Sequence, residues 1–133
     1  MAAPNIVNVS TITGITTVVA GITTDVLADR NGISTIVSNA SGSNKVLKIT
    51  TLVATAIGAT TGVDVFIYDT ASAHVTAGST VSIAQTMTVP IFSSLAVIDK
   101  NNSIYLQEDS QIGARAQSNS GIIDIVCSYE DIS

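Results

Sequence analysis

Short runs of Val, Ile and Thr, broken at fairly even intervals by Gly, Asn, Asp and Ser, constrain the fold of this chain more than any other feature. β-Branched residues favour strands, and the residues between the runs favour turns. No long stretch has the apolar spacing of an amphipathic helix. The pattern therefore predicts an all-β fold of short strands joined by turns.

Individual strands can be assigned from residue 33 onward. Pro90 ends one of them, because proline has no N–H to donate to a β-ladder. About eight strands of this length predict an antiparallel β-sandwich of the jelly-roll type, with a closed barrel as the alternative. The expected strands cover residues 33–38, 45–57, 63–69, 80–89, 91–99, 103–108, 111–117 and 122–129.

The last expected strand alternates apolar and polar residues, which predicts that one of its faces lies in the core. Cys127 belongs to the apolar set, so we expect it in the core against Leu106 and Ala114. The strands 103–108 and 111–117 are expected to form the preceding hairpin. The expected core residues are Ile104, Leu106, Ile112, Ala114, Ala116, Ile123, Ile125, Cys127 and Tyr129, with Tyr105, Gln107, Arg115, Gln117, Asp124, Val126, Ser128 and Glu130 outside.

The chain has 133 residues, the length of one ordinary domain. We expect a single β-sandwich domain over residues 14–133, preceded by residues 1–13 as an N-terminal arm or as the first strand. A terminal segment stays poorly ordered unless something ties it down, and strand addition to a partner's sheet edge would do so. The candidate partner-binding residues of this arm are Ile6, Val7, Val9 and Ile12.

The surface of the protein must be weakly charged. Only 11% of residues are charged and the net charge is −5, against about 25% charged residues in an average protein. Such a surface costs little to desolvate on docking, which favours assembly with other proteins, although a monomer with a Ser/Thr-rich exterior fits equally well. The five cations are scattered, which disfavours nucleic-acid binding. No basic signal region or membrane-length apolar run precedes Arg30, so we expect no export and no membrane span.

Residues for catalysis or metal binding are scarce. The only histidine, His74, falls in a loop-like stretch, and Cys127 falls on the inward face of a strand. The closest carboxylate pairs, Asp64 with Asp69 and Glu108 with Asp109, do not fit a calcium loop. Asp64 is expected to face solvent on its strand. The sequence therefore predicts no enzyme, no cofactor and no metal site.

Two segments carry a resemblance to a known group of proteins: NASGSNKVLKITTLVATAIGATTGVDVFIYD at 39–69 and IDKNNSIYLQEDSQIGARAQSNSGIIDIVCSYEDIS at 98–133. Both resemble small virion structural proteins of tailed phages, especially marine cyanobacterial phages. The opening MAAPNIVNVSTITG is similar to the start of those chains. The resemblance covers most of the chain, apart from residues 18–30 and 70–79.

The resemblance implies a β-sandwich component of the virion, which brings no active-site residues with it. The expected role is a capsid decoration, or cement, protein that is made in the host cytoplasm and sits on the capsid surface. Its expected partners are the major capsid protein and further copies of itself, as a homotrimer. A tail, neck or fibre component is the first alternative. A carbohydrate-binding β-sandwich is the second, although the chain has no Trp and only three Tyr to stack on sugar rings.

Overall fold

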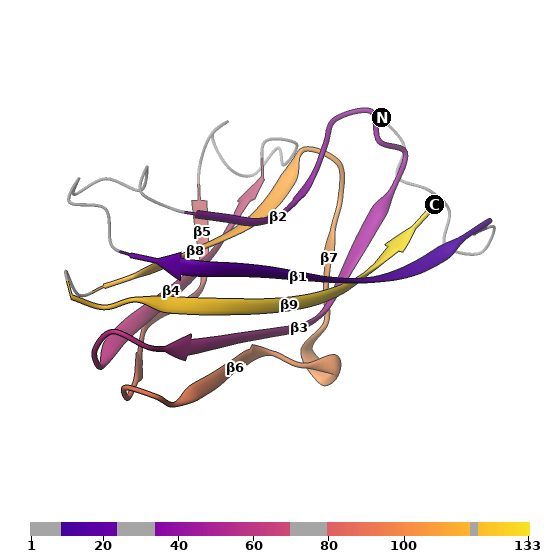
Figure 1. Cartoon of the computed structure of the whole chain (residues 1–133). Helices are drawn as coiled ribbons and strands as arrows, with labels where there is room; N and C mark the ends of the chain where they lie inside the picture. Colours follow the sequence, from indigo (N-terminus) through magenta and orange to yellow (C-terminus); the bar gives the residue numbers. More distant parts are fainter. Residues whose placement is uncertain (1–8, 24–33, 70–79, 118–119) are drawn as a thin grey trace.

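The computed structural model describes residues 9–23, 34–69, 80–117 and 120–133, and these form two antiparallel sheets packed face to face (Figure 1). The expectation of an all-β sandwich is confirmed. All eight strands expected from residue 33 onward are present, and a further strand precedes them. The described part of the chain thus holds nine strands and one short 3-10 turn.

The strands divide between a five-stranded sheet A and a four-stranded sheet B. Sheet A has the order β1 (Ile12–Ile22), β9 (Ile123–Ile132), β3 (Val46–Ala56) and β6 (Ser94–Ile98), with β7 (Ile104–Leu106) also paired to β3. Sheet B has the order β2 (Ser34–Asn39), β8 (Ser110–Ala116), β4 (Thr61–Asp69) and β5 (Thr80–Val89).

The chain passes repeatedly from one sheet to the other. In sheet A the last strand lies between the first and the third, and in sheet B the eighth lies between the second and the fourth. This interleaving of early and late strands is the double Greek key of a jelly roll. The 3-10 turn η3 (Lys100–Asn102) divides the strand that closes sheet A into β6 and β7, and Asp99 caps it by accepting the N–H groups of Asn101 and Asn102.

Between the sheets lies one core, built mainly from Ile, Val, Leu and Ala. β9 follows the predicted alternation, because Ile123, Ile125 and Cys127 are fully buried whereas Val126 is exposed. Tyr129, at the end of the same row, is half-buried against the core. The residues with no exposed surface are Ile49, Leu52, Ala54, Ala56, Val63, Val65, Ile112, Ala114, Ala116, Ile123, Ile125 and Cys127, together with Asp64.

The hairpin expected from residues 103–117 is wrong. β7 pairs with β3 in sheet A and β8 pairs with β2 and β4 in sheet B, so the Glu108–Asp109 link crosses between the sheets. The inward face of each strand was nevertheless predicted correctly, since Leu106 and Ala114 are both buried. Alternation identifies the face that a strand buries, whereas it does not identify the sheet to which the strand belongs.

Candidate functional site

Asp64, at the centre of β4, is completely buried, which corrects the expectation that it faces solvent. Its Oδ1 accepts the backbone N–H of Thr86 at 2.7 Å. Its Oδ2 accepts from Arg115 Nε at 2.9 Å and from the side-chain amide of Gln117. A buried carboxylate is tolerable only when it is paired and hydrogen-bonded, and these three donors meet that requirement.

Arg115 covers Asp64 and links it to an aromatic ring. Its guanidinium carbon lies 5.3 Å from the centroid of the Phe66 ring, within the range of a cation–π contact. Gly113 stands opposite Phe66 on β8. Asp64, Arg115, Gln117 and Phe66 therefore form a cluster on the outer side of sheet B, in which the polar groups bind one another. We interpret this cluster as structural.

Glu108 is a second buried carboxylate, and it holds a turn. Its two oxygens accept the backbone N–H groups of Gly42 (3.3 Å) and Asn44 (2.6 Å), which have φ angles of 72° and 55°. Beside it, the Asn39 amide donates to the carbonyls of Lys45 and Leu106. These bonds fix the link between β2 and β3. The Glu108 carboxylate and the Asn39 amide nitrogen therefore already have partners within the chain.

The single thiol of the chain lies in the core. Cys127 stands between Thr17 of β1 and Leu52 of β3 in the ladder, and it shares one cluster with Leu106 and Ala114, as the sequence predicted. Burial raises the pKa of the Cys127 thiol from 9.0 to about 11. A thiol that stays protonated is a poor nucleophile.

The described residues contain no group of three or more His, Cys, Asp or Glu side chains placed to hold a metal ion. His74 and the side chain of Asp69 lie outside the part of the chain that the structure describes. Glu108 and Asp109, the neighbouring carboxylates of the sequence, lie in the turn between β7 and β8, where Asp109 has a φ of 63°.

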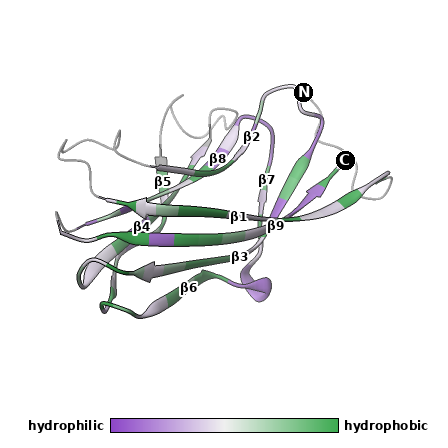
Figure 2. Cartoon of the chain, viewed as in Figure 1, coloured by the Kyte–Doolittle hydropathy of each residue, from purple (hydrophilic) through white to green (hydrophobic). Residues whose placement is uncertain are grey.

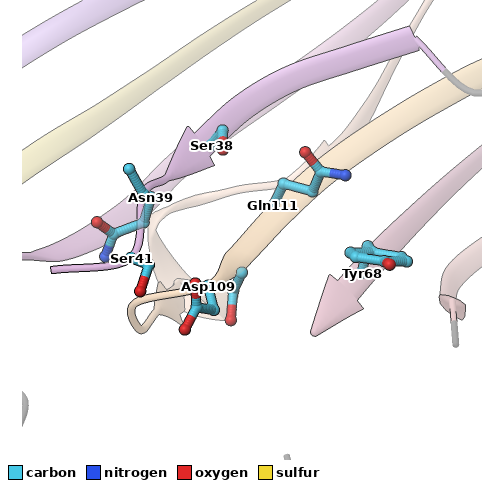
Figure 3. A pocket seen from close by; sticks show the side chains of 8 residues that line it. Ser38, Asn39, Ser41, Tyr68, Asp109 and Gln111 are labelled. Atoms are coloured by element: carbon cyan, nitrogen blue, oxygen red, sulfur yellow. The ribbon is translucent and has the colours of Figure 1, made fainter. Parts of the chain in front are cut away.

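A shallow polar pocket of about 190 Å³ opens at the end of sheet B (Figure 3). It is smaller than the roughly 300–1,000 Å³ of typical small-molecule sites. Tyr68 from the end of β4 forms one wall, Asn39 and Ser41 form the opposite one, and Asp109 lies between them. The remaining lining residues are Ser38, Ala40, Ser110 and Gln111.

The outer face of sheet A carries an apolar row that crosses four strands. The ladder places Val18, Val126, Val53 and Ala96 side by side, one residue from each of β1, β9, β3 and β6. Val18 is 65% exposed and Val126 is 42% exposed. Directly paired residues point to the same side of a sheet, so these four side chains form a continuous stripe on the outer face. We call it the valine stripe.

Hydroxyl groups flank the valine stripe on both sides. Thr16 and Ser128 share a hydrogen bond of 3.0 Å on one side, and Thr55 and Ser94 share one of 2.8 Å on the other. These hydroxyls are already bonded across the strands, so they flank the stripe with uncharged polar groups, and Asp124, the ladder partner of Thr55, adds one carboxylate on the second side.

Nearby charged side chains are engaged within the chain. Lys48 Nζ lies 3.8 Å from Glu130 Oε2, and Lys45 Nζ lies 2.8 Å from Asp131 Oδ2. Asp124 accepts the N–H of Gly21 at 2.9 Å. A partner docking on this face would therefore desolvate little unpaired charge.

Two of the four candidate partner-binding residues can be placed. Ile12 is the first residue of β1 and is 61% exposed, while Val9 is half-buried. Ile6 and Val7 lie outside the described residues. Ile12 points to the same face as the valine stripe. The sequence did not predict this stripe, because it joins residues up to 108 positions apart.

Comparisons with known proteins identify no family for this chain. No protein-family model matches the chain, and no curated protein matches it. In the described part of the chain, no helix has the length and apolar character needed to cross a membrane.

Proposed function

We propose that this chain is a non-enzymatic virion structural protein, a capsid decoration protein that binds across neighbouring major capsid subunits. The resemblance of residues 39–69 and 98–133 to small phage virion proteins suggests the virion. The jelly roll is a fold that viral capsid proteins use among many others, so it is compatible with this role without defining it.

The observation that carries the proposal is the outer face of sheet A. It combines the valine stripe with paired hydroxyls and internally paired charges. A rigid sheet presents such a face with little entropy left to lose on docking. A stable contact needs on the order of 1,000 Å² of buried surface in total, and sheet A offers the outer face of five strands for it.

Cryo-electron microscopy of virions that contain this chain tests the proposal. We expect density for the jelly roll on the outside of the head, with sheet A facing the shell. Density confined to the tail, neck or fibres would overturn the capsid assignment and favour the first alternative.

A Val126→Lys variant connects this test to the proposed surface. Val126 lies in the middle of the valine stripe, so a lysine there should prevent incorporation into heads while leaving the fold intact. Val81→Lys is the matched control, because Val81 is an exposed valine of sheet B. Equal incorporation of both variants would contradict docking through sheet A.

Carbohydrate binding is the weaker alternative, and the structure offers one place to test it. Tyr68 lines the polar pocket, whereas Tyr105 is 50% exposed on the outer side of sheet A, beside Lys48. Tight glycan binding that is lost in Tyr68→Ala or Tyr105→Ala would support this alternative over the capsid role.

A further inference from the structure

β1 forms one edge of sheet A (Figure 1). Within the described residues it pairs only with β9. Its sequence, ITGITTVVAGI, contains no charged residue and no proline, the usual devices that stop an edge strand from pairing with another chain. Figure 2 accordingly shows the strand mainly in hydrophobic and near-neutral colours.

The hydrogen bonds reveal which groups of β1 remain at the edge. Thr11 and Ser133 exchange both backbone bonds, each of 3.0 Å. Reciprocal bonds alternate along an antiparallel pair, and the register runs unbroken from Ile12 to Val19. The residues whose N–H and C=O groups point away from β9 are therefore Ile12, Gly14, Thr16 and Val18.

These four residues are complementary to themselves. If a second copy of β1 lies antiparallel with Ile15 opposite its own counterpart, Ile12 faces Val18 of the second copy and Gly14 faces its Thr16. Each such pair can exchange two backbone hydrogen bonds. The two most exposed apolar side chains of the strand, Ile12 at 61% and Val18 at 65%, would then cover one another.

The absence of charge on β1 allows a second copy to be the occupant. Two chains that each carry a net charge of −5 repel, so a self-contact needs a contact line without charge. β1 supplies such a line, because no like charges face each other across it.

We propose that the outward edge of β1, which no other described strand pairs with, is a self-association site, at which two copies join sheet A to sheet A around a two-fold axis through Ile15. The contact closes on a dimer, whereas the resemblance implied a trimer. It does not depend on the capsid role and leaves the valine stripe open on one side of the extended sheet.

Sedimentation of the purified full chain over a range of concentrations tests this site with one backbone variant. Thr16→Pro removes an outward N–H and leaves the ladder to β9 intact, because the Thr16 N–H points away from β9. We expect the wild type to form a dimer, and Thr16→Pro to dissociate at least about tenfold more readily. Thermal unfolding of each variant verifies that it folds.

Three side-chain variants complete the test. Val18→Lys keeps every N–H and places a charged side chain against the apolar Ile12 of the second copy, so it should also weaken the dimer, and it replaces Thr16→Pro if that variant fails to fold. Val81→Lys, on the edge of sheet B, and Val126→Lys, on β9, should leave the dimer unchanged. A monomeric wild type, or a dimer or trimer insensitive to both β1 variants, would overturn the proposal, and neither result would bear on the location of the chain in a virion.

Discussion

The strands β1 and β5 each pair with a single neighbour among the described residues, and neither contains a charged residue, yet their geometries differ. β1 keeps its register to β9 over eight consecutive residues, Ile12 to Val19. β5 shifts register twice against β4, and Thr86 adopts a φ of 55°. Irregular edges of this kind resist pairing with another chain. The comparison teaches that similar edge sequences can carry opposite propensities for association.

The cause of the difference lies on a neighbouring strand. Asp64 of β4 accepts the N–H of Thr86 and so holds the irregular part of β5 in place. β1 has its only register shift at its far end, between Val19 and Ile22, where Gly21 has a φ of 72°. The regular part of β1 is thus the part that can accept another strand.

Asp64→Ala should have the largest effect. It removes the acceptor for Thr86, Arg115 and Gln117 and leaves a partly buried cation, so the free energy of unfolding should fall by about 3 kcal/mol in urea titrations. Asp64→Asn keeps an acceptor oxygen and should lose less. A loss below about 1 kcal/mol in Asp64→Ala would mean that the carboxylate does not hold β5.

Cys127→Ala probes β9, the strand on which β1 is built. Loss of packing at a fully buried position should lower the free energy of unfolding by about 1 kcal/mol, and Cys127→Asp should be far worse because its charge would be desolvated without a partner. The native thiol should resist maleimide. Rapid labelling would contradict the register between β1 and β9.

The same thiol gives a pH dependence with a definite sign. Its pKa is raised in the folded protein to about 11 from 9.0, so the folded state holds this proton more tightly than the unfolded state. The stabilisation is complete below pH 9.0 and declines as the pH rises toward about 11. Wild type should therefore lose stability over this range faster than Cys127→Ala, and parallel curves would contradict the burial.

Gly14→Val should have a smaller, favourable effect. A side chain at Gly14 meets nothing within 4 Å, and valine suits a strand better than glycine. In the proposed dimer it would pack against Thr16 of the second copy, which should strengthen association by about 0.5 kcal/mol in sedimentation experiments. Ala20→Val, outside the paired segment, should leave association unchanged, and equal effects of the two would argue against the proposed register.

Local patterns predicted much of this fold and little of its surface. The eight strands and the inward face of β9 follow from alternation and turn residues, because both depend on neighbours in sequence. The sheet to which β7 and β8 belong depends on contacts that alternation does not encode. Alternation predicts that Asp64 faces solvent. It does not reveal the burial of this side chain, because the hydrogen-bond donors that surround it, Arg115, Gln117 and Thr86, are distant in the sequence.

Amide hydrogen exchange followed by NMR tests the central claim, that the edge of β1 is paired with a second copy, most directly. The outward amides of Gly14, Thr16 and Val18 have no partner in sheet A, so in a monomer they exchange much faster than those of Ile15 and Thr17. We predict that all five amides are protected at high protein concentration, and that protection of the outward three is lost on dilution. Fast exchange of those three at every concentration, with Ile15 and Thr17 still protected, would contradict the account.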